Sequence, residues 1–340
     1  MKAAVLTKAG SIELKEVPMV SLHKDTEVII KVKAVGICGT DLHIFNGERA
    51  DVKYPRIMGH ELSGIVVKKG EQARQFDIGD HVIFNPVIAC HQCPACEKEH
   101  ENVCNEVKCF GVQMDGGYQE YISVEEASLY RIPKNIPFET AALGEPFSIA
   151  ANIMSKLQIK EGDNAVIIGA GTIGIAVLKA LKKAGARVMA TDISDKKLEN
   201  AARFGADIVI NTARENLTEQ SEKFFEKGID IIIDAVGISE TLNNAVKIAS
   251  PCASIIVLGF DNRPLNITPA DITKKELKFF GSRMNNRKFP EVVRWLEEKV
   301  ITEDMITKTY SFADIQKAFE DTLAHGDEWI KTMIVMEEAI

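Results

Sequence analysis

Four of the chain's seven cysteines fall within fifteen consecutive residues: Cys90, Cys93, Cys96 and Cys104. Four thiolates this close together can bind a tetrahedral Zn²⁺ ion, which binds sulfur tightly and imposes no directional preference of its own. The rival interpretations are two disulfides, which are rare in the cytosol, and a redox Cys-x-x-Cys pair, which would begin a helix in a βαβ unit. Because all four ligands come from the protein, we expect a closed, structural zinc site in segment 89–105.

A glycine motif, Gly169-Ala-Gly171-Thr-Ile-Gly174, follows an apolar run and leads directly into a helical pattern. The G-x-G-x-x-G spacing alone is a weak signal, but between a strand and a helix it predicts a dinucleotide-binding turn. Gly169 permits the sharp turn, Gly171 lets the backbone approach a pyrophosphate, and Gly174 lets helix and strand pack closely. The free N–H groups of the helix start favour an anion there. The predicted cofactor-binding residues of this turn are Gly169, Gly171, Thr172, Ile173 and Gly174.

Asp192 ends the next predicted strand, at the spacing of a carboxylate that binds a ribose. It would accept hydrogen bonds from the adenosine ribose hydroxyls and would repel a 2′-phosphate. The residues that follow, Ile193, Ser194 and Asp195, include no arginine to receive such a phosphate. We therefore expect NAD as the cofactor and not NADP. The alternative role for Asp192 is a helix cap at the end of the strand.

A second group of metal-binding side chains lies nearer the N-terminus, in Gly36-Ile-Cys38-Gly-Thr40-Asp41-Leu-His43 and in Gly59-His60-Glu61. Each has an ordinary interpretation when taken alone. A single cysteine is usually a small buried hydrophobe, and a His-Glu pair usually lies at the surface. Their combination with the four-cysteine segment and the glycine motif favours a metal-dependent active site.

The predicted secondary structure that would position these residues differs between the two halves of the chain. Up to about residue 135, short strands alternate with turns; in 28–34 every second residue is apolar, as in a half-buried strand. From about residue 164, apolar runs without alternation are separated by helical segments, a pattern that suits a parallel sheet buried on both faces. We expect helices near 289–299 and 313–324. A last strand near 331–336 would pack onto the N-terminal domain or complete the sheet.

The length and net charge of the chain limit the classes of protein to which it can belong. At 340 residues, the chain is expected to form two domains. A net charge of −8 and an isoelectric point near 5.5 argue against a nucleic-acid partner, whose binding surface would be basic. With no run of ~18 apolar residues and no signal-peptide pattern at the N-terminus, we expect no membrane span and a cytoplasmic location.

Together these motifs resemble the zinc-dependent medium-chain alcohol and polyol dehydrogenases, in order and spacing over essentially the whole chain. Asp115-Gly-Gly117 and Glu145-Pro146 belong to the same pattern. The resemblance implies an α/β fold: a GroES-like β domain, a Rossmann domain with a doubly wound parallel sheet, and a C-terminal return to the first domain. The boundaries we expect are 1–147, 148–288 and 289–340.

The resemblance also makes Cys38 and His60 ligands of a second, catalytic zinc ion. Alcohol dehydrogenases proper complete this set with a second cysteine, but the matching residue here is Glu145. In relatives with the Glu-Pro element, the carboxylate that follows the histidine binds the metal, and that residue is Glu61. We therefore expect Cys38, His60 and Glu61 as ligands, with two zinc ions per chain. Glu145 would bind directly or lie close by, and Asp41 would orient the imidazole.

The reaction implied is the oxidation of an alcohol. Zinc lowers the pKa of a bound water toward ~7 and would act similarly on a substrate hydroxyl, so that hydride can pass to the nicotinamide and leave a ketone. Thr40 resembles the hydroxyl of the family's proton relay, and His43 resembles its outer end. The alternatives are a turn hydroxyl and a surface histidine. Lys197 matches a position that contacts the adenosine ribose, or it is a lysine on a helix surface.

The substrate is polyhydroxylated according to the same resemblance, which is greatest to bacterial L-galactonate and L-gulonate 5-dehydrogenases. Arg283 lies where polyol-type relatives place a substrate-facing arginine, and we also expect Glu145 at the substrate. A guanidinium group can hold a hydroxyl pair or a carboxylate, so a hexonate is favoured; the alternative is a surface arginine. A polyol dehydrogenase, an L-threonine 3-dehydrogenase and a non-catalytic NAD-binding regulator are the other functions considered. The family also implies a homo-dimer or tetramer, joined near 254–259 and 278–281.

Overall fold

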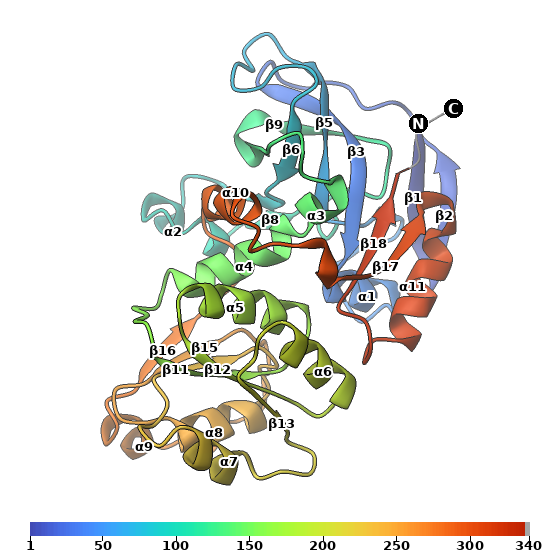
Figure 1. Ribbon diagram of the computed structural model, residues 1–340. Coiled ribbons are helices and arrows are strands. Elements are labelled where there is room, and N and C mark those ends of the chain that lie inside the picture. Colours follow the sequence, from blue (N-terminus) through green and yellow to red (C-terminus); the bar gives the residue numbers. More distant parts are fainter. Residues whose placement is uncertain (337–340) are drawn as a thin grey trace. The chain divides into compact units, whose positions relative to one another are not determined.

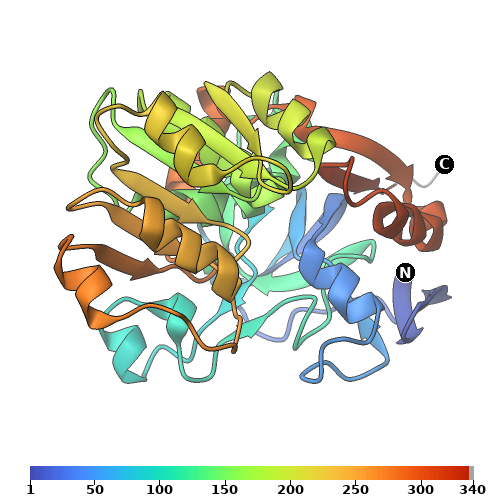
Figure 2. The same cartoon turned by 90° about the horizontal axis from the view of Figure 1, so that it is seen from below.

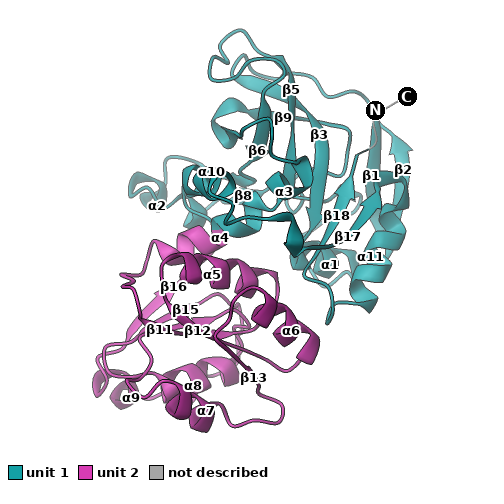
Figure 3. Ribbon diagram, viewed as in Figure 1, with its two compact units in different colours: residues 1–148, 285–340 teal, residues 149–284 magenta. Residues whose placement is uncertain are grey.

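The computed structural model describes residues 1–336. They form two compact units, coloured separately in Figure 3: residues 1–148 with 285–336, and Ile149–Met284. Of the predicted C-terminal segment, residues 337–340 lie outside the described part of the chain. Each unit has its own sheets and its own hydrophobic core.

The first unit contains a three-stranded sheet in the order β2-β1-β4 and a seven-stranded sheet in the order β10-β6-β5-β3-β18-β17, in which β9 also pairs with β3. Strands β7 and β8 form a separate pair. The bounds are β1 (Lys2–Lys8), β2 (Ser11–Glu16), β3 (Glu27–Ile37), β4 (Arg56–Ile57), β5 (Glu61–Lys69), β6 (His81–Phe84), β7 (Val87–Ile88), β8 (Lys108–Cys109), β9 (Tyr121–Glu125), β10 (Leu129–Arg131), β17 (Ile306–Ser311) and β18 (Lys331–Val335).

Strand β3 is central to this sheet (Figure 1). Its residues Val28, Ile30 and Val32 are buried, which is the face predicted from the alternating pattern. On its far side, β18 pairs antiparallel with β3 and parallel with β17. The C-terminal strand, predicted near 331–336, therefore lies beside the strand that leads to Cys38.

The second unit is a six-stranded sheet in the order β13-β12-β11-β14-β15-β16, with every pair parallel. Helices α5 and α6 cover one face of the sheet, and α7 and α8 cover the other (Figures 1 and 2). The strand order reverses between β11 and β14, where open α/β sheets bind ligands. The bounds are β11 (Asn164–Ile168), β12 (Arg187–Asp192), β13 (Ile208–Asn211), β14 (Ile231–Asp234), β15 (Ser254–Val257), β16 (Lys278–Gly281), α5 (Thr172–Lys183), α6 (Asp195–Arg203), α7 (Leu217–Phe224), α8 (Ser239–Ile248) and α9 (Pro269–Thr273).

Short helices connect the strands of the first unit. The two helices predicted near 289–299 and 313–324 are observed as α10 and α11, the second after a 3₁₀ turn at Phe312–Asp314. Helix α4 contains the boundary between the units. The bounds are α1 (Gly39–Phe45), α2 (Pro94–Glu97), α3 (Phe138–Ala142), α4 (Gly144–Met154), α10 (Phe289–Glu297), α11 (Ile315–Ala324), and the 3₁₀ turns η1 (Glu101–Val103), η2 (Glu126–Ser128) and η3 (Glu303–Met305).

Candidate active site and nucleotide site

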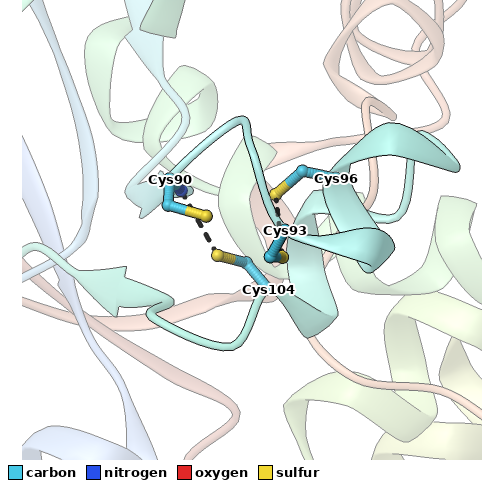
Figure 4. Close-up of side chains that lie close together, drawn as sticks. All are labelled: Cys90, Cys93, Cys96 and Cys104. Atoms are coloured by element: carbon cyan, nitrogen blue, oxygen red, sulfur yellow. Dashed lines mark hydrogen bonds between the residues drawn. The ribbon is translucent and has the colours of Figure 1, made fainter.

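The four clustered cysteines turn their sulfur atoms toward one another (Figure 4). Cys93 caps α2, which carries Cys96, and Cys104 follows η1. The four Sγ atoms all lie within 4.8 Å of one another, and all four residues are free thiols. This spacing suits a tetrahedral ion with Zn–S bonds of about 2.3 Å, so these residues fit a structural zinc ion.

Backbone N–H groups surround two of these sulfurs. The amides of Asn105 and Cys96 lower the pKa of the Cys93 thiol to about 6. The Cys90 amide, 3.2 Å from the Cys104 sulfur, lowers the pKa of the Cys104 thiol. Hydrogen bonds to the charged form favour a thiolate, and the thiolate is the form that binds metal.

Cys38, His60 and Glu61 form a second group of metal-binding side chains. Cys38 follows β3, and Glu61 opens β5 directly after His60. The antiparallel register of β3 and β5, with Gly36 opposite Glu61, brings the three residues together. One ligand atom from each lies within 4.8 Å of the others, and His60 and Glu61 are buried. The set fits a metal ion with one thiolate, one imidazole and one carboxylate ligand.

Asp41 lies behind the imidazole of His60. It is fully buried and accepts hydrogen bonds from the Cys38 amide (3.0 Å), the Gly59 amide (3.3 Å) and the Tyr118 hydroxyl (3.3 Å). Its Oδ1 lies 3.7 Å from His60 Nδ1, a buried nitrogen that has no hydrogen-bond partner. With Nδ1 turned toward a carboxylate, Nε2 is the nitrogen available to a metal, as in other carboxylate–histidine–zinc sites.

Lys331, which the sequence analysis did not single out, also reaches this site. Its Nζ donates to both carboxylate oxygens of Glu61, at 2.8 and 2.7 Å, and to the Ile37 carbonyl at 3.0 Å. Both side chains of this ion pair are 2% exposed. The sequence did contain a signal, because Lys331 lies in a mostly apolar segment, 330–336, and a buried lysine needs a partner.

Glu145 and Cys109 lie near enough to interact electrostatically with the metal-binding group. Burial, together with the Glu61 charge, raises the pKa of the Glu145 carboxyl to about 7, against the opposing influence of His60 and Lys331. Burial raises the pKa of Cys109 to about 12, so its thiol is uncharged at neutral pH. Among residues 1–336, neither belongs to the compact ligand set of Cys38, His60 and Glu61. A direct zinc bond from Glu145 stays a prediction.

Helix α1 carries the two residues of the predicted proton relay. Thr40 is half-buried, and His43, one helical turn later, is exposed. The Nδ1 atom of His43 lies 2.5 Å from a carboxylate oxygen of Glu48. A hydroxyl inside and an imidazole outside is the order that proton release requires, and the relay itself stays a prediction.

The glycine turn between β11 and α5 leaves room for a phosphate group. Gly169 has a φ of +97°, and a Cβ atom on Gly174 would lie 2.0 Å from the Gly169 carbonyl oxygen. Around Gly171, which caps α5, no heavy atom other than those of Gly171 and its two chain neighbours lies within 4 Å of the position that a Cβ atom would take. Two glycines are thus required by the turn and its packing, whereas the third leaves open space before the N-terminus of α5. A pyrophosphate fits this combination.

Asp192 stands at the end of β12 with a fixed carboxylate. One oxygen accepts a hydrogen bond from the Ala170 amide (2.8 Å), and the other accepts from the amides of Ile193 (2.8 Å) and Ser194 (3.0 Å). The first of these bonds joins the acid to the glycine turn. The carboxylate thereby stays beside the predicted dinucleotide site, although its amide bonds also agree with the capping role.

We expect Asp192→Asn to raise KM for NAD about 10-fold or more while leaving kcat nearly unchanged. The neutral amide keeps an acceptor for the backbone but weakens charge-assisted bonds to ribose hydroxyls, worth about 1.5–3 kcal/mol. It also removes the charge that repels a 2′-phosphate, so the preference for NAD over NADP should fall. Steady-state kinetics with both cofactors measure this. Asp195→Asn, at an exposed acid paired with Arg214, is the control and should change neither value.

Arg283 and Lys197 are the remaining predicted contacts. Arg283 follows β16 with an exposed side chain, and its carbonyl accepts a hydrogen bond from Asn152 at 3.5 Å. Lys197 lies half-buried in the first turn of α6. Their roles toward substrate and ribose stay predictions.

Comparison with known proteins identifies the family. Residues 24–134 match the alcohol dehydrogenase GroES-like domain, and residues 172–298 match the zinc-binding dehydrogenase family. The starvation-sensing protein RspB of Escherichia coli K12 is 38% identical over 335 residues, which cover 96% of this chain and 97% of RspB. L-galactonate-5-dehydrogenase of the same strain is 33% identical over 324 residues, 94% of each chain. The crystal structure of the alcohol dehydrogenase rspB from E. coli CFT073, complexed with NADH, superimposes with a TM-score of 0.90 at 36% identity, covering 98% of this chain and 99% of that one.

The chain therefore belongs to the zinc-type medium-chain alcohol dehydrogenases. It is an NAD-dependent oxidoreductase of that family, with zinc as its metal. The predicted family and the predicted fold class, a GroES-like domain with a Rossmann-type parallel sheet, are confirmed. None of the helices within residues 1–336 has both the length and the hydropathy needed to cross a bilayer.

Proposed function

We propose that this protein oxidises a secondary hydroxyl of a sugar acid to a ketone and transfers the hydride to NAD. The observation that carries the proposal is the convergence of half-buried Cys38 with buried His60 and Glu61 in a chain from this dehydrogenase family. A closed site with four protein ligands, like that of the cysteine segment, has no free position for a substrate. The three-ligand site does, so it is the reaction centre.

Each residue of the proposed reaction centre has a separate role in the reaction. Cys38, His60 and Glu61 would hold the zinc ion, which when bound polarises a substrate hydroxyl and lowers its pKa. Asp41 fixes the His60 imidazole from behind. The Thr40 hydroxyl accepts the proton that the substrate releases.

As Thr40 takes up that proton it gives its own toward the cofactor ribose, and His43, on the exposed side of α1, is the outer end of this relay to solvent. In the second unit, the N-terminus of α5 binds the pyrophosphate, and Asp192 accepts from the adenosine ribose. Lys197 contacts the same ribose from α6.

A hexonate is the proposed substrate because one guanidinium group can hold its carboxylate. Arg283 supplies that group, and Glu145 accepts a hydrogen bond from a substrate hydroxyl. The similarity to an L-galactonate dehydrogenase supports this choice. A neutral polyol would use the same zinc and NAD chemistry without needing the arginine.

A substrate panel tests the proposal. The purified protein, loaded with zinc and NAD, is offered hexonates, neutral polyols and L-threonine, and NADH absorbance is followed. We expect selective turnover of one hexonate, and Arg283→Gln should raise its KM about 10-fold or more, because a charge-assisted bond is lost. Turnover confined to polyols or threonine would reject the sugar acid and keep the mechanism. NADH binding without turnover of any alcohol would reject the enzymatic proposal.

We further propose a homo-oligomer formed through β16, the last strand of the parallel sheet. Within residues 1–336 no strand pairs with the outer edge of β16, where Phe279 is 37% exposed. An open edge of this kind can pair with a second copy of the chain. Phe279→Lys should convert a dimer or tetramer to monomer in light scattering. Ile78→Lys, at an exposed apolar residue of the first unit, should not; a monomeric wild-type protein would contradict the proposal.

A further inference from the structure

The hydroxyl of Tyr118 reaches the Asp41 carboxylate from the segment between β8 and β9, which contributes no residue to the proposed metal ligands. Tyr118 is fully buried, and its backbone is fixed on two sides: its N–H donates to the Met58 carbonyl at 3.0 Å, and its carbonyl accepts from the Ala4 amide at 2.8 Å. The ring packs edge-on against Phe319, with the ring centroids 5.7 Å apart. Close packing around a ring held in this way gives its oxygen one position.

This hydroxyl has one proton and two acceptors. The Gly36 carbonyl oxygen lies 3.0 Å from the Tyr118 oxygen, and Oδ2 of Asp41 lies 3.3 Å from it. A phenol has a single O–H donor, so the two acceptors share it. Burial, followed by the nearby Asp41 charge, raises the pKa of the Tyr118 phenol well above its ordinary value, and the hydroxyl therefore stays a donor.

The Asp41 carboxylate is held by three donors and not by the imidazole that it faces. Two of the donors are the backbone amides of Cys38 and Gly59, and the third is the Tyr118 hydroxyl. Oδ1 of Asp41 lies 3.7 Å from His60 Nδ1, which has no hydrogen-bond partner among the described residues. That distance exceeds the ~2.7–3.2 Å of an N–H···O hydrogen bond. The amides are fixed in the backbone, whereas the hydroxyl can rotate toward its other acceptor.

We propose that Tyr118 is a positioning residue that acts on His60 through Asp41. By donating to the carboxylate, the hydroxyl neutralises part of its negative charge and limits how strongly Asp41 attracts the Nδ1 proton of His60. The strength of that attraction sets how much electron density the imidazole gives to a metal at its other nitrogen. A weaker attraction leaves a bound zinc ion more able to polarise a substrate hydroxyl. The inference rests on the proposed reaction centre at Cys38, His60 and Glu61.

Removing the hydroxyl tests this arrangement. In Tyr118→Phe, the Nδ1 proton resonance of His60 should move downfield by about 1 ppm or more, because Asp41 becomes the stronger acceptor. The imidazole then becomes the stronger ligand, so zinc should bind the Cys38 site about 3-fold or more tightly than in the wild type. Proton NMR of the zinc-loaded, full-length protein with ¹⁵N-labelled histidine measures the resonance, which His60→Ala identifies by its absence. Competition with a chromogenic chelator measures the affinity.

Two comparisons show whether the effect passes through the carboxylate. Tyr310→Phe removes another hydroxyl–carboxylate bond of the same unit, to Asp321 at 2.5 Å, and should change neither value. In an Asp41→Asn background, Tyr118→Phe should change zinc affinity by less than about 2-fold, because the charge on which the hydroxyl acts is gone. An equal tightening without that charge would overturn the inference, as would an unmoved resonance or unchanged or weaker zinc binding in Tyr118→Phe.

A second replacement covers the case in which Tyr118→Phe does not fold. Replacing Tyr118 by 3-fluorotyrosine keeps the ring and the hydroxyl but makes the phenol a stronger donor. The His60 resonance should then move upfield and zinc should bind more weakly than in the wild type. No change in either value would overturn the inference.

Failure of this inference differs from failure of the proposed function. A wild-type protein that holds zinc only at the four-cysteine segment would reject the proposed reaction centre itself. A wild-type protein with zinc at both sites, whose zinc affinity and His60 resonance are the same in Tyr118→Phe, would reject only the role of Tyr118.

Discussion

Cys38→Ala is expected to lower kcat by at least about a thousandfold and to remove one of two zinc ions per chain. The thiolate is one of three proposed ligands, and loss of the metal removes several kcal/mol of stabilisation from the developing alkoxide. NADH should still bind with near wild-type affinity, because the glycine turn and Asp192 belong to the second unit, Ile149–Met284. Turnover, zinc content by mass spectrometry and NADH fluorescence give the three values.

The control for this variant is Cys252→Ala, which removes an exposed thiol of the second unit. It should retain two zinc ions and full turnover. Full activity in Cys38→Ala would contradict the proposed reaction centre. Loss of NADH binding together with turnover would point to misfolding, and His60→Ala, directly before β5, then tests the same ligand set.

Cys104→Ser is expected to remove the other zinc ion and to lower the free energy of unfolding by at least about 3 kcal/mol. Metal binding at a site of this kind contributes directly to folding, and segment 89–105 contains little regular structure besides α2 and η1. Arg287 donates to Glu99 and Glu101, at 2.9 and 2.8 Å, so loosening the segment also disturbs residues that begin the C-terminal part of the first unit.

Zinc content and thermal unfolding followed by circular dichroism measure this effect. Cys252→Ser, the same exchange at an exposed site, should leave both unchanged. A Cys104→Ser protein that keeps two zinc ions and its full stability would contradict the structural role. The two cysteine variants also distinguish the two zinc sites. The main effect of Cys104→Ser should be on the free energy of unfolding, and the main effect of Cys38→Ala should be on kcat.

The sequence predicted best those features whose parts lie close together in the chain. The four cysteines span fifteen residues, and the glycine turn spans six, so spacing alone constrains their geometry. The pairing of Cys38 with His60 needed the family resemblance, because two strands must meet in a particular register to bring them together.

Local residue spacing could not predict contacts between segments that are far apart in the sequence. Lys331 and Glu61 are 270 residues apart, and only the return of β18 to β3 makes them partners. The Tyr118 hydroxyl, which donates to Asp41, is another contact that no local pattern indicates. The substrate depends on side chains such as Arg283, whose type permits several ligands, so residue type and spacing narrow the class of substrate without selecting one.

Anomalous X-ray scattering at the zinc edge, from crystals of the protein purified with zinc, tests the central claim most directly. We predict two zinc peaks per chain, one among the four cysteines and one between Cys38, His60 and Glu61. The second peak identifies the reaction centre without requiring the substrate to be known. A single peak at the cysteines, with no metal at Cys38, would contradict the account.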